Sequence, residues 1–362
     1  MAESAYDVLG IGNAIVDVLA HTDDKFLIKH GLAKGSMALV DEARAQLIYD
    51  SMGPAMEISG GSAANTIAGI ASLGGRGVFI GKVKADQLGE VFRHDIRATG
   101  VAFDTEPASE GPNTARSFIL ITPDAQRTMN THLGACVNLS PDDVDPNVVS
   151  GAQVTYLEGY LWDPPFAKAA FRKAMEIAHS AGRKVALTLS DTFCVDRYRE
   201  EFLDLAENSV DILFANDAEI CSLYQTNDFD AALQNLRGRC EIAALTRSEL
   251  GSVVVTGEEV HVIDDEQAGS VSHRRISRLG GETVIYETYD RTSVESFRGM
   301  QLCYRIQLDQ HPRDGSFARL QGRPRCSRST TFLGHETEPG LPTHLGPPSQ
   351  RRSTLAGRAP RS

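Results

Sequence analysis

Residues 154–189 read VTYLEGYLWDPPFAKAAFRKAMEIAHSAGRKVALTL, and this stretch decides the fold class. The apolar run at 154–158 is typical of a buried strand. Residues 164–181 place their apolar side chains on one helical face, and Gly182 ends that helix before a second apolar run at 185–189. A strand, a helix and a strand in this order predict two parallel strands covered by the helix between them.

The same alternation extends to both sides of that stretch. It predicts an α/β fold with a mostly parallel central sheet and helices on both faces, whose ligands bind beyond the carboxyl ends of the strands. The hairpin expected around 117–130 breaks the alternation, so residues near 103–133 are expected to form a small β lid. The other predicted elements are strands at 6–12, 78–83, 210–215 and 242–246, helices at 62–73 and 217–224, a helix start at 140–143, and a hairpin at 252–263.

The composition narrows the class of protein. With 41% hydrophobic and 23% charged residues, the chain has ordinary globular usage, which excludes wholesale disorder. A net charge of -12 argues against nucleic-acid partners. No leader and no long apolar run are visible, so we expect a cytoplasmic protein without membrane contact. The six cysteines form no CxxC pair and are expected to be free thiols. The oligomeric state stays open.

The composition changes near residue 264. Residues 264–362 hold fifteen Arg and no Lys, whereas all eight Lys lie at or before Lys184. We therefore expect one α/β domain over 1–263, with a lid formed by about 19–40 and 103–133, and a largely disordered tail over 264–362. A tail of this composition is typical of GC-rich DNA read out of frame, and a true divergent tail is the alternative.

Two segments could bind a polyhydroxylated ligand. Asp17 follows the first predicted strand and could accept two hydrogen bonds from a vicinal diol, although its spacing alone favours an ordinary turn Asp. Gly60 and Gly61 open a helix whose first turn holds small residues and Asn65. A ligand could then approach backbone amides at the positive end of the helix dipole. A loop capped by a Ser is an equally good interpretation.

Two further segments could bind phosphate. Asn216 and Glu219 follow a predicted strand, and their spacing favours a capping box over a magnesium–phosphate site reached through water. Thr246 and Gly251 follow the next strand and could hold phosphate oxygens, or they form a plain turn. Arg127 in the predicted lid hairpin could neutralise phosphate, or it is a solvated surface Arg.

Taken together and in order, these segments resemble the ribokinase-like (PfkB) carbohydrate kinase family, and in particular its bacterial adenosine kinase branch. The resemblance covers about residues 5–263. It implies a ribokinase-like α/β fold with a β lid, and transfer of the γ-phosphoryl of ATP, with Mg²⁺, to a hydroxymethyl group of a nucleoside or sugar. The matching text is YDVLGIGNAIVDV, SGGSAANTIAGIASLGG, RTMNTHLGAC, YLEGYLWDPP, LSDTFCVDRYR and VDILFANDAEICSLY.

The resemblance also implies a role for each candidate residue. The nucleoside or sugar would be bound by Asp17, Asn13, Gly60, Gly61 and Asn65, with the glycine pair as the lid hinge. On the nucleotide side, Asn216 and Glu219 would organise Mg²⁺ and phosphates, Thr246 and Gly251 would lie at the nucleotide, and Arg127 would help neutralise the transferring phosphoryl group.

One family segment is missing from this sequence. The family carries D-T-x-G-A-G-D after the region that matches 246–251, with an anion hole at Gly-Ala-Gly and a general base at the last Asp. No such segment stands between residues 264 and 362, where Gly280-Gly281-Glu282 is the nearest glycine pair with an acid. The resemblance thus implies an adenosine kinase impaired by this loss, with ribose or fructose as alternative acceptors. A non-catalytic sugar- or nucleoside-binding protein is the second hypothesis. Asp264, Asp265 and Asp290 are the substitute bases to consider.

Overall fold

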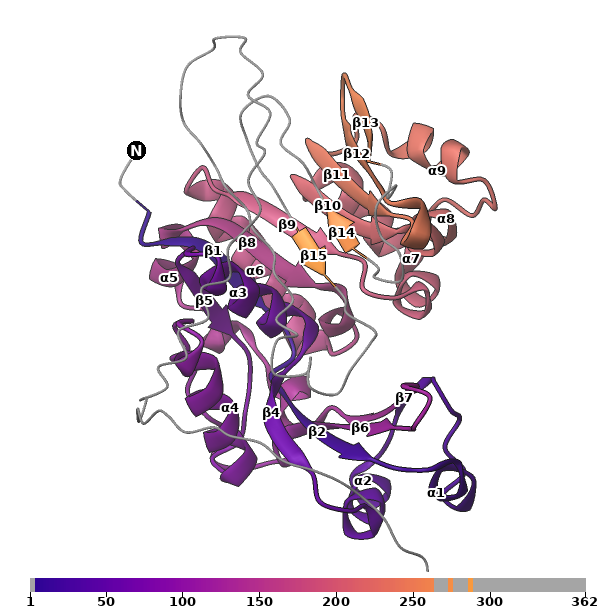
Figure 1. Ribbon diagram of the computed structural model, residues 1–362. Coiled ribbons are helices and arrows are strands. Elements are labelled where there is room, and N and C mark those ends of the chain that lie inside the picture. The colour runs from indigo at the N-terminus through magenta and orange to yellow at the C-terminus, as the bar shows by residue number, and fades with distance from the viewer. Residues whose placement is uncertain (1–3, 264–272, 276–285, 289–362) are drawn as a thin grey trace, which may run out of the picture. The chain divides into compact units, whose positions relative to one another are not determined.

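Figure 1 shows the computed structural model of the chain, which describes residues 4–263, 273–275 and 286–288. The chain divides into two units, Met1–His311 and Pro312–Ser362, and all the described residues belong to the first. Within them, no helix is both long enough and apolar enough to cross a membrane.

An eight-stranded sheet forms the centre of the α/β part. Neighbouring strands from β5 to β11 are parallel, and β12 and β13 add an antiparallel edge. The carboxyl ends of β1, β8, β9, β10 and β11 therefore share one edge. The strand order is β13 (Val260–Ile263), β12 (Ser252–Thr256), β11 (Ile242–Thr246), β10 (Ile212–Asn216), β9 (Lys184–Thr188), β8 (Ala152–Glu158), β1 (Tyr6–Ile11) and β5 (Gly77–Ile80).

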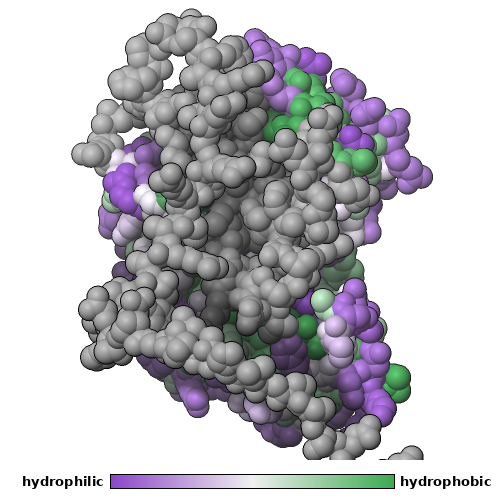
Figure 2. Space-filling view, viewed as in Figure 1, coloured by the Kyte–Doolittle hydropathy of each residue, from purple (hydrophilic) through white to green (hydrophobic). Residues whose placement is uncertain are grey.

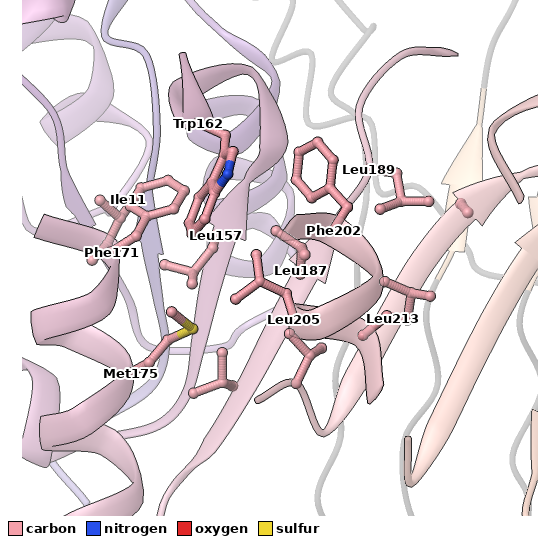
Figure 3. Close-up of a cluster of buried hydrophobic side chains, with 14 of the residues drawn as sticks. Ile11, Leu157, Trp162, Phe171, Met175, Leu187, Leu189, Phe202, Leu205 and Leu213 are labelled. Atoms are coloured by element: carbon pink, nitrogen blue, oxygen red, sulfur yellow. The ribbon is translucent and has the colours of Figure 1, made fainter. Parts of the chain in front are cut away.

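Five helices bury one face of this sheet. Trp162, Phe171 and Phe202 pack there against strand residues such as Leu157 and Leu187, all fully or almost fully buried (Figure 3). The apolar stripe of residues 164–181 thus covers the strands on either side of it, as its spacing predicts. The helices are α5 (Pro146–Gly151), α6 (Pro165–Ser180), α7 (Thr192–Asn208), α8 (Asp217–Leu223) and α9 (Phe229–Leu236).

The other face carries α3 (Ser62–Ser72) and α4 (Gln87–Ala98). Phe79 of β5 packs against α4, and its ring centroid is 6.0 Å from that of Phe92 on this helix and 5.9 Å from that of Phe103. Since Leu9 packs on the first face and Val8 on the second, the strands alternate between two cores. Helices cover both faces, and the predicted α/β class is confirmed.

A second, five-stranded sheet carries α1 (Asp24–Lys29) and α2 (Glu42–Ser51) on one face, where Val16, Val18 and Phe118 are buried (Figure 1). Its strands run in the order β3 (Met37–Leu39), β7 (Arg127–His132), β6 (Ala115–Ile121), β2 (Ile15–His21) and β4 (Met56–Gly60).

The structure differs from the expected elements in three places. The second sheet takes in residues 15–60 and 115–132, a wider first segment than 19–40, while Ala108 in the expected lid segment forms an isolated bridge to Lys84, which lies beyond the end of β5. The helix start at 140–143 is a single 3-10 turn, η2 (Pro141–Asp143), closed by a capping box. The expected disorder of the tail lies outside the described residues, apart from the paired strands β14 (His273–Arg275) and β15 (Tyr286–Thr288).

The antiparallel edge of the main sheet exposes apolar side chains. Val260 and Val262 of β13 are 38% and 60% exposed. Figure 2 shows hydrophobic surface, in green, in the region where Figure 1 places β12 and β13. An exposed apolar edge strand is a site of unwanted association.

In the described residues, Cys136, Cys194, Cys221 and Cys240 are free thiols.

Candidate functional site

Two of the passages of the chain between the two sheets lie next to each other. Residues 12–14 lead from β1 into β2, and Gly60 and Gly61 lead from β4 into α3. A Cβ on Gly60 would lie 2.3 Å from Oδ2 of Asp17, so the Asp17 carboxylate rests directly on this glycine. Gly61 has a φ of +95°, and a Cβ there would lie 2.3 Å from the Asn13 carbonyl oxygen. Only glycines allow these two approaches.

Asp17 lies inside β2, between Ile15 and His21, and not in a turn after the first strand. The side chain is half-buried. Burial raises the pKa of Asp17 to about 7, and the charge of Arg127 acts in the opposite direction. No residue in the described part of the chain donates a hydrogen bond to this carboxylate. It is thus an acceptor placed at the crossing point with its hydrogen-bonding capacity unused.

Arg127 begins β7 and is exposed. It pairs with Ile121 of β6, which in turn pairs with His21 of β2. Directly opposite residues share a sheet face, and so do residues two apart on one strand. Arg127 and Asp17 therefore lie on the same face of the second sheet, the one opposite α1 and α2.

The first turn of α3 completes this group. The N-cap of α3 is Gly61, which offers no side-chain cap, so the Ser cap considered from the sequence is not what starts the helix. The hydroxyl of Ser62 instead donates to Glu158 at the end of β8. Asn65 is half-buried in this turn, and its backbone N–H donates to the Gly61 carbonyl at 2.9 Å. Glu158 had no motif to mark it in the sequence.

Asn216 and Glu219 form the predicted capping box. The Asn216 side chain accepts from the Glu219 N–H at 2.8 Å, and the Glu219 carboxylate accepts from the Asn216 backbone and side-chain nitrogens at 3.0 and 2.6 Å. Glu219 is 6% exposed. The structural interpretation of this spacing is therefore confirmed. Among the described residues, no group of three His, Cys, Asp or Glu side chains gathers to hold a metal ion.

Thr246 lies next to Asn216 in the sheet, as its ladder partner at the carboxyl end of β11. Its hydroxyl oxygen is buried and has no hydrogen-bond partner among the described residues. A buried hydroxyl without a partner costs roughly 1–3 kcal/mol, which a ligand oxygen would recover. Gly251, with a φ of +80°, ends the short η4 turn (Ser248–Leu250) that follows. This edge can accommodate a polar group such as a phosphate.

Substituting Gly61 with Ala should lower the free energy of unfolding by about 2–4 kcal/mol, through left-handed backbone strain together with a clash against the Asn13 carbonyl. Gly74→Ala is the matched control at the other end of α3. Its φ is +88° and its Cβ would meet nothing within 4 Å, so it should cost only about 1–2 kcal/mol. Urea denaturation measures both, and equal costs would contradict the close approach at Gly61.

The chain matches the pfkB family carbohydrate kinase model over residues 55–271, which is more than half of its length. It therefore belongs to the pfkB family of carbohydrate kinases, and it is a carbohydrate or nucleoside kinase by family. Kinases of this family use ATP as the phosphate donor.

Two curated relatives are kinases that are named for different acceptors. The chain is 27% identical over 218 residues to an ATP-dependent ribose-1-phosphate kinase of Halopiger xanaduensis, covering 58% of this chain and 69% of that protein. It is 26% identical over 237 residues to the guanosine-inosine kinase of Escherichia coli, covering 62% of this chain and 54% of that protein. The match thus spans about half the length of the second relative.

Two solved structures are more similar in sequence. The adenosine kinase from Sinorhizobium meliloti is 57% identical, with a TM-score of 0.68, over 73% of this chain and 81% of that one. A probable sugar kinase from Rhizobium etli is 53% identical, with a TM-score of 0.69, over 74% and 82% of the two chains. These similarities confirm the ribokinase-like fold.

Proposed function

We propose that this protein descends from, and retains the acceptor site of, an ATP-dependent nucleoside kinase that phosphorylates the hydroxymethyl group of adenosine. The similarity to the Sinorhizobium adenosine kinase supports this choice within the family. The observation that carries the proposal is the Asp17 carboxylate, placed against Gly60 with unused acceptors beside an apolar strip of the second sheet.

The sugar of the nucleoside would bind at the crossing point. The two oxygens of Asp17 can accept from two neighbouring ring hydroxyls, and Asn65 offers a polar side chain from the first turn of α3. The glycines at 60 and 61 let a ligand approach the backbone and the positive end of the α3 dipole. Asn13 would contribute through its carbonyl oxygens, because its backbone and side-chain nitrogens already donate to Glu158 at 2.6 and 2.9 Å.

The base would lie on the apolar strip next to Asp17. Leu19 follows Asp17 on the same face of β2 and pairs with Ile119 of β6, which pairs with Met129 of β7. Ile58, the ladder partner of Asp17, extends the strip. A flat purine ring can pack against the half-buried Ile58 and Met129, whereas a free sugar would place hydroxyls against them without hydrogen bonds. The strip therefore favours a nucleoside over ribose or fructose, and residues 15–60 and 115–132 would act as the lid.

The nucleotide would bind at the edge formed by β10 and β11. The partnerless hydroxyl of Thr246, with Asn216 beside it and the turn at Gly251 after it, fits a phosphate group. Arg127 would neutralise phosphate charge from the lid side. Mg²⁺ would be held chiefly by the phosphates and by water, with Glu219 acting through water because Asn216 already occupies its carboxylate. ATP supplies the phosphoryl group.

This chain would be a weak catalyst. Its sequence contains no Gly-Ala-Gly-Asp segment, so it lacks the family's anion hole and general base in their usual place. Asp264, Asp265 and Asp290, the substitute bases considered above, lie outside the described residues. The same observation favours the second candidate function, a non-catalytic protein that binds a nucleoside or sugar through the acceptor site alone.

Calorimetric titration of the purified chain with adenosine, ribose and fructose tests the acceptor. Binding does not need the missing segment, so the chain as written can be used. We expect adenosine to bind at least about ten times more tightly than either sugar, a difference of about 1.4 kcal/mol for covering the apolar strip. Equal affinity for adenosine and ribose, or preference for a free sugar, would contradict the assignment.

A further inference from the structure

One buried carboxylate touches two adjacent crossings, at residues 12–14 and at the start of α3. Glu158 ends β8 and is 1% exposed. Its Oε2 accepts from the backbone and side-chain nitrogens of Asn13 at 2.6 and 2.9 Å. Its Oε1 accepts from the hydroxyl of Ser62 and from the backbone N–H of Ala63, the latter at 3.4 Å. Both oxygens therefore face donors of this chain.

The partners of Glu158 explain how a buried charge is tolerated. Burial raises the pKa of the Glu158 carboxyl, and the hydrogen bonds from Ser62, Asn13 and Ala63 act in the opposite direction. No Lys, Arg or His in the described residues forms an ion pair with it. Its charge is stabilised instead by donors and by the N-terminus of α3, which has no cap of its own. Glu158 thus caps α3 from another strand.

The residues that donate to Glu158 lie next to the acceptor site along the chain. Asn13 lies where the chain enters the second sheet, and Ser62 and Ala63 lie where it returns, directly after Gly60 and Gly61. A Cβ at Gly12 would lie 2.9 Å from the Glu158 Oε2, so the approach is as close as the backbone allows. One side chain of the main sheet therefore contacts the chain at these two adjacent crossings.

We propose that Glu158 is a positioning residue, which holds the Asn13 crossing and the start of α3 in register so that Asp17, Gly60 and Asn65 face one ligand. This role rests on the proposed nucleoside site, although Glu158 itself does not touch the ligand. Its charge state is essential, because each of its two oxygens receives two donors. An amide in its place would turn an NH₂ group toward either the Asn13 or the Ala63 N–H.

Glu158→Gln tests the proposal with two readouts. We expect the Kd for adenosine to rise about 10- to 100-fold, and amide exchange at Asn13 and at residues 62–65 to become at least about ten times faster. Asp211→Asn is the matched control. Asp211 is a half-buried carboxylate that accepts from the Val185 N–H at 2.7 Å, but it precedes β10 at the opposite edge of the sheet. The Asp211→Asn variant should lower the melting temperature but leave the adenosine Kd and the amide exchange rates unchanged.

If the Glu158→Gln variant does not fold, Ser62→Ala tests the same proposal. It removes one of the four donors, so the adenosine Kd should rise about threefold and exchange at Ala63 should quicken. The proposal is overturned if the Glu158 variant keeps both the affinity and the exchange rates of the parent, or if Asp211→Asn changes both equally. If the parent does not bind adenosine, the proposed function fails. In that case, the amide exchange rates at Asn13 and Ala63, compared between the Glu158 variant and the parent, test the positioning role of Glu158 by themselves.

Discussion

Alanine in place of Asp17 abolishes measurable adenosine binding and leaves the fold intact; this is the largest single effect we expect at the acceptor site. Asp17 projects over Gly60 and contributes no hydrogen bond to the described fold, so its loss costs the core little. Losing its two hydrogen bonds to sugar hydroxyls would cost the complex roughly 1–3 kcal/mol each. Calorimetry measures the affinity, and an unchanged Kd in Asp17→Ala would remove this residue from the site.

The Asp17 carboxylate should also make the affinity for adenosine depend on pH. Burial raises the pKa of Asp17 to about 7, so the acceptor form grows as the pH rises from about 6 to about 8, and adenosine affinity should grow with it. Stability has the opposite sign. The folded protein holds this proton more tightly than the unfolded chain, so the contribution of Asp17 to stability is lost as the pH rises through about 7. Asp17→Asn should therefore lose the pH dependence of the adenosine affinity near pH 7 and the part of the pH dependence of stability that Asp17 contributes.

Phosphoryl transfer by the chain as written is expected to be at least a hundredfold slower than by a version that carries the family's C-terminal segment. A general base and a preorganised anion hole each contribute roughly 10²–10⁴ in rate. Residues 264–362 supply neither in the family's form. Single-turnover assays with ATP and adenosine compare the two proteins. Comparable rates would show that another residue supplies the base, and Asp264→Asn, Asp265→Asn and Asp290→Asn would identify it.

Strong local patterns account for what the sequence predicted of the fold. The apolar stripe of α6 and the runs in β8 and β9 were recognisable because parallel strands are buried on both faces and their helix on one. The Asn216–Glu219 spacing correctly indicated a capping box, because that contact is local. The first segment of the second sheet was predicted too narrowly. Its helix α1 has only six residues, and the Asp23 N-cap that starts it is a weak signal alone.

The candidate site shows why spacing alone misses part of a binding site. Asp17 was placed in a turn, whereas the strand β2 that carries it is defined by partners 41 to 100 residues away in the chain, such as Ile58 and Ser117. Glu158 was missed altogether, because its partner Asn13 is 145 residues distant and a single acid at a strand end has no spacing to recognise. The strand that carries Asp17 and the hydrogen bonds of Glu158 both depend on residues far apart in the chain, and a short motif cannot contain such pairs.

The most direct test of the central claim measures ADP release with adenosine, ribose and fructose by the chain that carries a restored family C-terminal segment. The claim is that the acceptor site beside Asp17, formed by residues of this chain, selects a nucleoside. The account predicts that kcat/KM for adenosine exceeds that for either sugar at least about tenfold, and that Asp17→Ala removes the activity. Equal or faster turnover of ribose or fructose, or full activity in Asp17→Ala, would contradict it.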